Sequence, residues 1–147
     1  MIYKIKTIKV EYNIKEKTTG HINTSETAFN LLKEIYRELD VDQEHFCILA
    51  LNSRNEITGY KIITSGGQTN AIIDPKIVFR NSLLLGAVKL ILAHNHPSGD
   101  VEPSSGDIVM NTNLKHCADL LDIKLLDHIV FSQNKFYSFA DNGLIKG

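Results

Sequence analysis

The stretch His94-Asn95-His96-Pro97-Ser98-Gly99-Asp100-Val101-Glu102-Pro103-Ser104-Ser105-Gly106-Asp107 lies at the centre of this sequence's chemistry. It follows the apolar run Val88 to Ala93, which is short, continuous and bounded by turn residues, and which therefore predicts a buried strand. His94 and His96 leave the end of that strand two residues apart, so an extended backbone points both imidazoles to one face. Pro97 to Asp100 has turn composition, and Ser104 predicts the N-cap of a helix.

Two imidazoles at this spacing could bind one metal ion. Asp107 could supply a third ligand, because Ser104 and Asp107 share one face of the predicted helix. Three imidazole and carboxylate ligands, with a fourth position left to water, are typical of catalytic zinc, whereas structural zinc normally has four protein ligands and relies on cysteine. Zinc lowers the pKa of its bound water from about 15.7 to about 7, and a nearby carboxylate must then take the proton. The pattern therefore favours a catalytic site that needs one further acid.

With these residues in view, the sequence resembles the JAB/MPN metalloproteases. The matching signature is His94-x-His96, seven residues, Ser104, two residues and Asp107. The letters His-Asn-His-Pro-Ser-Gly-Asp, followed by Pro-Ser, resemble the bacterial RadC branch in particular. Further matching pieces follow in order, and they are Glu44-x-Phe46, Pro75-Lys76, Leu126 to Val130 and Tyr137 to Phe139. The resemblance covers about residues 25–143.

The resemblance implies an architecture and a cofactor. The architecture is that of JAB/MPN domains, which is related to the cytidine deaminases. The implied cofactor is Zn²⁺, held by His94, His96 and Asp107. Deamination itself is not expected, because the deaminase signature needs His-x-Glu and a downstream Pro-Cys-x-x-Cys, and this sequence has neither.

The resemblance also implies residue roles in hydrolysis. Glu44 would be the general acid/base and Ser104 would stabilise the oxyanion, so the chain would cleave a peptide or isopeptide bond in a peptide or protein substrate. Glu56 and Glu102 lie in the same region and remain open as the acid. Taken alone, Ser104 and Asp107 fit a helix-capping pair better than catalytic residues. Only the combination with two histidines after a buried strand favours the metal site.

Two other functional classes remain open. RadC proteins are linked to DNA repair, and longer ones carry helix-hairpin-helix segments before the JAB domain. We expect the 43 residues before Glu44 to be too few for that addition. The net charge of −1 lacks the overall positive charge that is typical of a nucleic-acid-binding protein. A local basic patch for DNA association remains an alternative. A metal-bearing scaffold without turnover is the third class, and the intact ligand set argues against it. The oligomeric state is not predicted.

Composition predicts an ordinary globular protein. With 147 residues, 43% hydrophobic and 22% charged, we expect one domain over residues 1–147 without an N-terminal helix-hairpin-helix region. No apolar run is long enough to span a membrane, and the N-terminus lacks a signal peptide, so we expect a cytoplasmic protein. Cys47 and Cys117 lack partners at ligand spacing and are predicted to be reduced core residues.

Hydrophobic periodicity predicts an α/β domain in which a mixed sheet is flanked by helices on both faces. Residues 2–14 alternate, with Ile8, Val10, Tyr12 and Ile14 on one side, and are predicted to form a half-buried strand. The other predicted strands are 44–51, 56–63, 88–93, 123–131 and 135–140, and the predicted helices are 25–39, 75–86 and 104–121.

Asp127 and His128 form a polar pair inside an apolar strand pattern. Such a pair either satisfies buried hydrogen bonds or contacts the residues that hold the metal. We favour the structural role.

Overall fold

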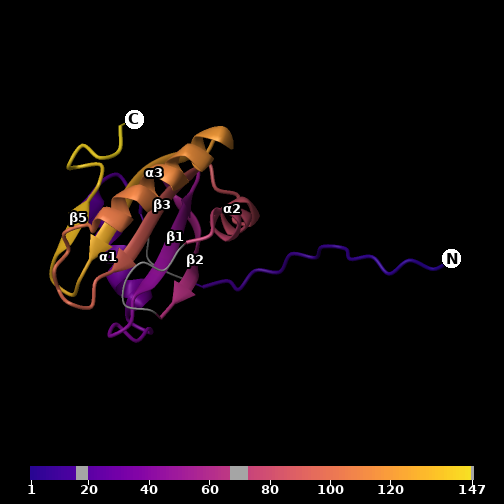
Figure 1. Ribbon diagram of the computed structural model, residues 1–147, viewed down its shortest axis with the longest axis horizontal. Coiled ribbons are helices and arrows are strands. Elements are labelled where there is room, and N and C mark those ends of the chain that lie inside the picture. Colours follow the sequence, from indigo (N-terminus) through magenta and orange to yellow (C-terminus); the bar gives the residue numbers. More distant parts are fainter. Residues whose placement is uncertain (16–19, 67–72, 147) are drawn as a thin grey trace.

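The computed structural model describes residues 1–15, 20–66 and 73–146. These residues form, in chain order, α1 (Ser25–Tyr36), β1 (His45–Leu51), β2 (Ile57–Ser65), α2 (Pro75–Leu84), β3 (Lys89–Asn95), α3 (Ser105–Leu120), β4 (Lys124–Phe131) and β5 (Phe136–Ser138). The strands make one sheet in the order β2-β1-β3-β4-β5, in which β3 and β4 are parallel and the other neighbours antiparallel (Figure 1). The predicted single α/β domain with a mixed sheet is confirmed. None of the three helices in the described residues is long and apolar enough to cross a membrane.

Helices cover both faces of the sheet. Successive strand residues point to opposite faces, and in the central strand both sets are apolar, so each face can pack against helices. In β1, Cys47 and Leu49 pack into one hydrophobic cluster with α1. Their neighbours Phe46 and Ile48 pack into a second cluster with α2 and α3. All seven residues of β1 are buried, as expected of a central strand that is covered on both faces. The sheet is therefore the middle of three layers.

The connection from β3 to β4 positions the polar stretch of the sequence. The two strands are parallel, and α3 is the crossover between them. The loop from β3 to α3 therefore passes over the carboxyl end of β3, which is where α/β folds commonly place ligand sites. The antiparallel pairing of β1 with β3 sets Phe46 opposite His94, so the residues just before β1 lie beside the end of β3.

Residues 2–14 do not form the predicted strand. No strand is assigned in residues 1–15, and Ile8 and Ile14 are 88% and 86% exposed. Figure 1 shows this segment extending away from the body. Alternation determines which side chains would share a strand face, but a strand also needs a hydrogen-bonded neighbour, and the described part of the chain provides none here.

Smaller differences concern the ends of elements. The first helix ends at Tyr36 rather than Leu39, where the chain turns and the Leu39 N–H donates to the Tyr36 carbonyl. The last strand is limited to Phe136–Ser138. Phe139 N still donates to the His128 carbonyl, but the Phe139 carbonyl accepts from Leu144 N and Ala140 N donates to the Asp127 carboxylate, so the pairing with β4 ends there. Neither difference changes the layers of the fold.

Both cysteines are free thiols, as predicted. Cys47 is fully buried in β1, and burial raises the pKa of its thiol far above the usual range. Cys117 lies on α3 and is only partly buried, so the expectation that both are core residues holds fully for Cys47 alone.

Candidate metal centre

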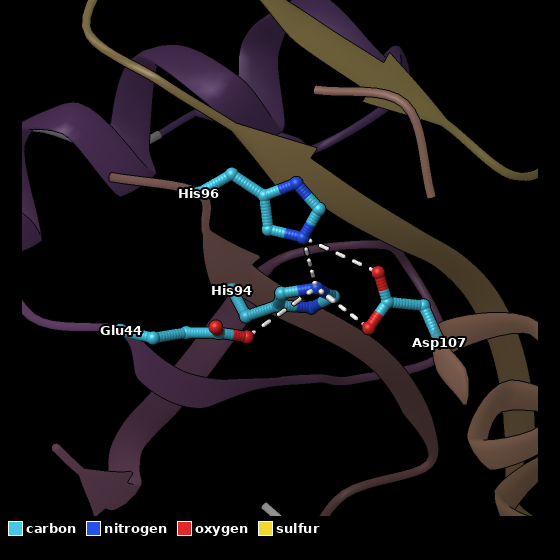
Figure 2. A group of neighbouring side chains, drawn as sticks. All are labelled: Glu44, His94, His96 and Asp107. Atoms are coloured by element: carbon cyan, nitrogen blue, oxygen red, sulfur yellow. Dashed lines mark hydrogen bonds and ion pairs between the residues drawn. The ribbon is translucent and has the colours of Figure 1, made fainter. Parts of the chain in front are cut away.

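Four side chains from separate parts of the chain converge at the carboxyl end of β3 (Figure 2). Glu44 directly precedes β1, His94 lies in β3, His96 follows it, and Asp107 lies in the first turn of α3. One potential ligand atom from each side chain lies within 4.8 Å of those from the other three. The fold therefore brings together the three residues predicted as metal ligands and the residue predicted as general acid/base.

The nitrogen and oxygen atoms are spaced like the ligands of a tetrahedral ion. His94 Nε2 lies 3.2 Å from His96 Nε2 and 3.3 Å from Asp107 Oδ1, and His96 Nε2 lies 3.2 Å from Asp107 Oδ2. Ligands about 2.0–2.1 Å from zinc at tetrahedral angles are about 3.3–3.4 Å apart. Glu44 Oε1 lies farther away, 3.8 Å from His94 Nε2. Two imidazoles and one carboxylate thus fit a small tetrahedral cation, with Glu44 next to it.

The His96 ring has a defined tautomer when it is neutral. Its Nδ1 lies 2.8 Å from the Asp100 carbonyl oxygen, which can only accept a hydrogen bond. The ring proton is therefore on Nδ1, and the lone pair of Nε2 points toward the other three side chains. The Pro97–Asp100 turn, predicted from its composition, supplies this carbonyl.

The His94 ring is oriented by a buried hydrogen-bond chain. His94 Nδ1 lies 2.9 Å from His128 Nε2, and His128 Nδ1 lies 3.1 Å from Asn111 Oδ1. Burial lowers the pKa of His128 well below its usual range, so that ring is neutral. Because the amide oxygen of Asn111 only accepts, His128 donates from Nδ1 and accepts at Nε2 from His94. His94 therefore also presents the lone pair of Nε2, as a metal ligand must.

The two carboxylates have opposite pKa shifts. Burial raises the pKa of Glu44 above its usual range, and the imidazoles of His94 and His96 offset this effect only in part. Burial alone would also raise the pKa of Asp107, but His94, His96 and the backbone N–H of Ser104 outweigh it and hold the pKa well below its usual range. Because the two pKa values are shifted in opposite directions, Asp107 suits the role of a permanent anion and Glu44 that of a proton acceptor.

Ser104 is the N-cap of α3 and forms a capping box with Asp107. Ser104 Oγ accepts from Asp107 N at 3.0 Å, and Asp107 Oδ2 accepts from Ser104 N at 2.9 Å. The capping interpretation of this pair is confirmed. The same Oδ2 faces His96 Nε2, so the cap also orients the carboxylate within the cluster.

The three candidate acids lie in different places. Glu44 belongs to the cluster. Glu56 is at the opposite end of the β1–β2 hairpin, where its carboxylate accepts from Asn52 and pairs with Arg54. Glu102 is exposed in the loop before α3 and is not part of the cluster found among the described residues. The geometry therefore favours Glu44 over the other two.

Asn95, to which the sequence analysis gave no role, ties the Glu44 segment to β3. Its side chain points away from the two histidines, and Oδ1 accepts from His45 N at 2.7 Å. Its Nδ2 donates to the Gln43 carbonyl at 2.9 Å. These bonds hold the residues on both sides of Glu44. Strand alternation could have predicted that the Asn95 side chain lies on the opposite face, because Asn95 stands between two histidines that share one face.

Asp127 and His128 have separate roles. The Asp127 carboxylate accepts from Ser138 Oγ at 2.6 Å and from Ala140 N at 3.0 Å, which is the structural role that we favoured. His128 instead contacts His94, which is a predicted metal ligand. For His128, therefore, the structure agrees with the other interpretation, a contact to the residues that would hold the metal.

A cleft of about 1020 Å³ adjoins the cluster at His96. Its walls are the loop after β3, part of α1 and the turn between β4 and β5, and its lining includes Lys33, Arg37, Asp42 and Lys135. Small-molecule sites measure about 300–1,000 Å³, so the volume of this cleft is at the upper end of that range. Of the four cluster residues, only His96 lines it.

Several known proteins are similar to this chain. The family model for the RadC-like JAB domain matches residues 22–144. A UPF0758 protein of Flavobacterium johnsoniae is 38% identical over 123 residues, which are 84% of this chain and 53% of that relative. A UPF0758 protein of Staphylococcus epidermidis is 44% identical over 104 residues, which are 71% of this chain and 46% of that relative. A UPF0758 protein of Chlorobaculum parvum is 36% identical over 138 residues, which are 94% of this chain and 60% of that relative. The chain thus spans about half the length of the curated relatives that it matches. Because the family model covers most of its length, this chain belongs to the RadC-like JAB domain family, as the histidine motif implied.

Proposed function

We propose that this chain is a zinc-dependent hydrolase of the JAB/MPN metallopeptidase type, which cleaves a peptide or isopeptide bond with metal-activated water. The observation that carries the proposal is the convergence of Glu44 with His94, His96 and Asp107 within 4.8 Å. Membership of the RadC-like JAB domain family supports it.

His94, His96 and Asp107 would hold the ion. Their two neutral imidazoles and one carboxylate, without cysteine, match the open catalytic type of zinc site. When bound there, zinc would polarise a carbonyl group and lower the pKa of a water molecule from about 15.7 to about 7.

Glu44 would move the proton. Burial raises its pKa toward the working range of a general base, while its side chain remains 23% exposed and can meet a substrate. It would take a proton from the attacking water and deliver it to the leaving amine. Its distance from His94 Nε2, longer than the spacings among the three ligands, agrees with a role beside the ion rather than on it.

Ser104 would stabilise the oxyanion that develops on the scissile carbonyl. Its Oγ accepts from Asp107 N, which leaves the hydroxyl hydrogen for donation. The residue caps the N-terminus of α3, where the helix dipole also favours negative charge.

The test is hydrolysis of peptide-linked and isopeptide-linked substrates by zinc-loaded protein. Glu44→Gln keeps the shape of the side chain and removes the base, so we expect turnover to fall by about 10²–10⁴-fold with zinc still bound. Glu56→Gln is the matched control and should act like wild type, because Glu56 lies at the far end of the hairpin. Full activity in Glu44→Gln, or no hydrolysis of any such substrate by the zinc-loaded wild type, would contradict the proposal.

A further inference from the structure

Glu44 is the member of the candidate metal centre that is held least by its own side chain. Its carboxylate faces His94 Nε2 at 3.8 Å (Figure 2), and no group in the described part of the chain donates a hydrogen bond to it. The side chain is also 23% exposed. The position of the carboxylate therefore depends on the backbone that carries it.

Hydrogen bonds from three neighbouring elements hold the backbone around Glu44. The Glu44 carbonyl accepts from the N–H of Gly66, directly after β2, at 3.0 Å. On β3, the Asn95 side chain bonds the residues before and after Glu44. On α1, the Tyr36 hydroxyl donates to the His45 carbonyl at 2.6 Å. The start of β1 is therefore tied to β2, β3 and α1.

The His45 ring adds two further hydrogen bonds at this point. It is buried on the α1 face of the sheet, edge-on to the Tyr36 ring, whereas Glu44 faces the cluster. Its Nε2 lies 2.5 Å from the Asp40 carbonyl oxygen, and its Nδ1 lies 2.7 Å from Ser65 Oγ. Because a carbonyl oxygen only accepts, the neutral ring carries its proton on Nε2 and accepts at Nδ1 from the Ser65 hydroxyl. The ring thus bridges the loop before β1 and the last residue of β2.

The bridge lies where the pairing of β1 with β2 is weakest. That pairing is irregular between Phe46 and Cys47, and it ends at the pair of His45 with Ser65. The end of a strand is the part that opens most easily. The bond from Ser65 to the ring joins the terminal pair through a side chain, directly beside Glu44. The other residues of β1 on the α1 face, Cys47, Leu49 and Leu51, are apolar, so packing alone does not call for histidine here.

We propose that His45 is a positioning residue for Glu44, and that its bonds to Asp40 and Ser65 keep the Glu44 carboxylate beside His94. The inference rests on the proposed function, in which Glu44 moves the proton. A base must lie within hydrogen-bond reach of the proton that it takes, and a displacement of about 1 Å can cost about 10²-fold in rate. Loss of the bridge should therefore lower kcat more than metal affinity, because the three proposed ligands lie on β3, on the loop after it and on α3.

Nuclear magnetic resonance of the cobalt-loaded protein tests the position of Glu44 without turnover. In protein labelled with carbon-13 glutamate, paramagnetic Co²⁺ shifts the Glu44 carboxyl signal according to its place relative to the ion, and Glu44→Gln identifies that signal. We expect His45→Phe, which removes both bonds, and Ser65→Ala, which removes one, to move or broaden it while cobalt affinity stays close to that of wild type. Thr58→Val is the matched control, because it removes a hydroxyl that donates to the Ala50 carbonyl near the other end of β2, and it should leave the signal unchanged.

Turnover of the zinc-loaded protein is the second readout. We expect kcat to fall by about 10–10²-fold in His45→Phe, and by less in Ser65→Ala, with KM little changed. Ser65→Ala decides the question if His45→Phe does not fold. Variants that lose stability but keep the wild-type Glu44 signal and kcat would overturn the proposal, because His45 would then serve packing alone. If the signal moves as expected but the wild type hydrolyses no substrate, the positioning role is supported and the hydrolase proposal fails. A wild type that takes up no cobalt would overturn both.

Discussion

Replacing Asn111 by leucine tests the hydrogen-bond chain that orients His94. Asn111 is 3% exposed, and its Oδ1 accepts from His128 Nδ1 at 3.1 Å. Leucine has a similar volume and no acceptor, so the buried donor on His128 loses its partner. An unsatisfied buried donor costs about 1–3 kcal/mol, and we expect the free energy of unfolding of the metal-free protein to fall by about that amount.

The substitution should also weaken metal binding. Without Asn111 as acceptor, His128 can carry its proton on Nε2 and donate to His94 Nδ1. His94 then holds its own proton on Nε2, the atom that faces His96 and Asp107, and a metal ion must displace it. Removing the outer partner of a ligand typically lowers metal affinity about 10–100-fold, and we expect a loss of that size.

Two measurements on three proteins separate these effects. Zinc affinity is measured by competition with a chromophoric chelator, and stability by urea unfolding, for wild type, Asn111→Leu and Asn111→Asp. Aspartate keeps an acceptor oxygen, so its zinc affinity should stay close to that of wild type. Equal zinc affinity in Asn111→Leu and wild type would refute the hydrogen-bond chain, whatever the change in stability.

Three further predictions concern single residues. Asn95→Ala should lower the free energy of unfolding by about 1–3 kcal/mol, because the buried N–H of His45 loses its acceptor. A loss below about 0.5 kcal/mol in urea unfolding would contradict this. A thiol reagent applied to the folded protein should modify Cys117 and spare Cys47, whose buried thiol has a raised pKa; mass spectrometry showing equal rates would argue against it. Ser104→Ala should lower stability by about 1 kcal/mol through loss of the cap, and turnover by about 10²–10³-fold if the hydroxyl binds the oxyanion; unchanged turnover would remove that role.

Local patterns in the sequence predicted part of the metal centre. Strand alternation placed His94 and His96 on one face, and capping chemistry placed Asp107 in the first turn of the following helix. Both patterns depend on residues close together in the chain. Glu44 is different, because it reaches the site through the antiparallel register that sets Phe46 opposite His94. No local pattern contains that register, and only the family resemblance pointed to Glu44.

Other features that the sequence analysis missed also depend on how distant segments pair. The contact between His94 and His128 joins two neighbouring parallel strands, which the sequence predicted individually without their register. Asn111 had a local signal that was not used, since it lies four residues after Asp107 on α3 and shares its face. Residues 2–14 failed as a predicted strand because alternation is a property of the segment, whereas pairing depends on an edge that the segment must reach.

The zinc content of the purified protein, measured by elemental analysis after zinc is supplied and excess removed, examines the metal centre itself. Wild type is compared with His96→Ala and Asp107→Ala, and with His116→Ala as control, because His116 is exposed on α3 away from the cluster. We expect about one zinc ion per chain in wild type and control, and loss of zinc in the two cluster variants while circular dichroism shows them folded. A wild type that takes up no zinc, or cluster variants that bind it as well as wild type, would contradict the assignment of His94, His96 and Asp107 as metal ligands.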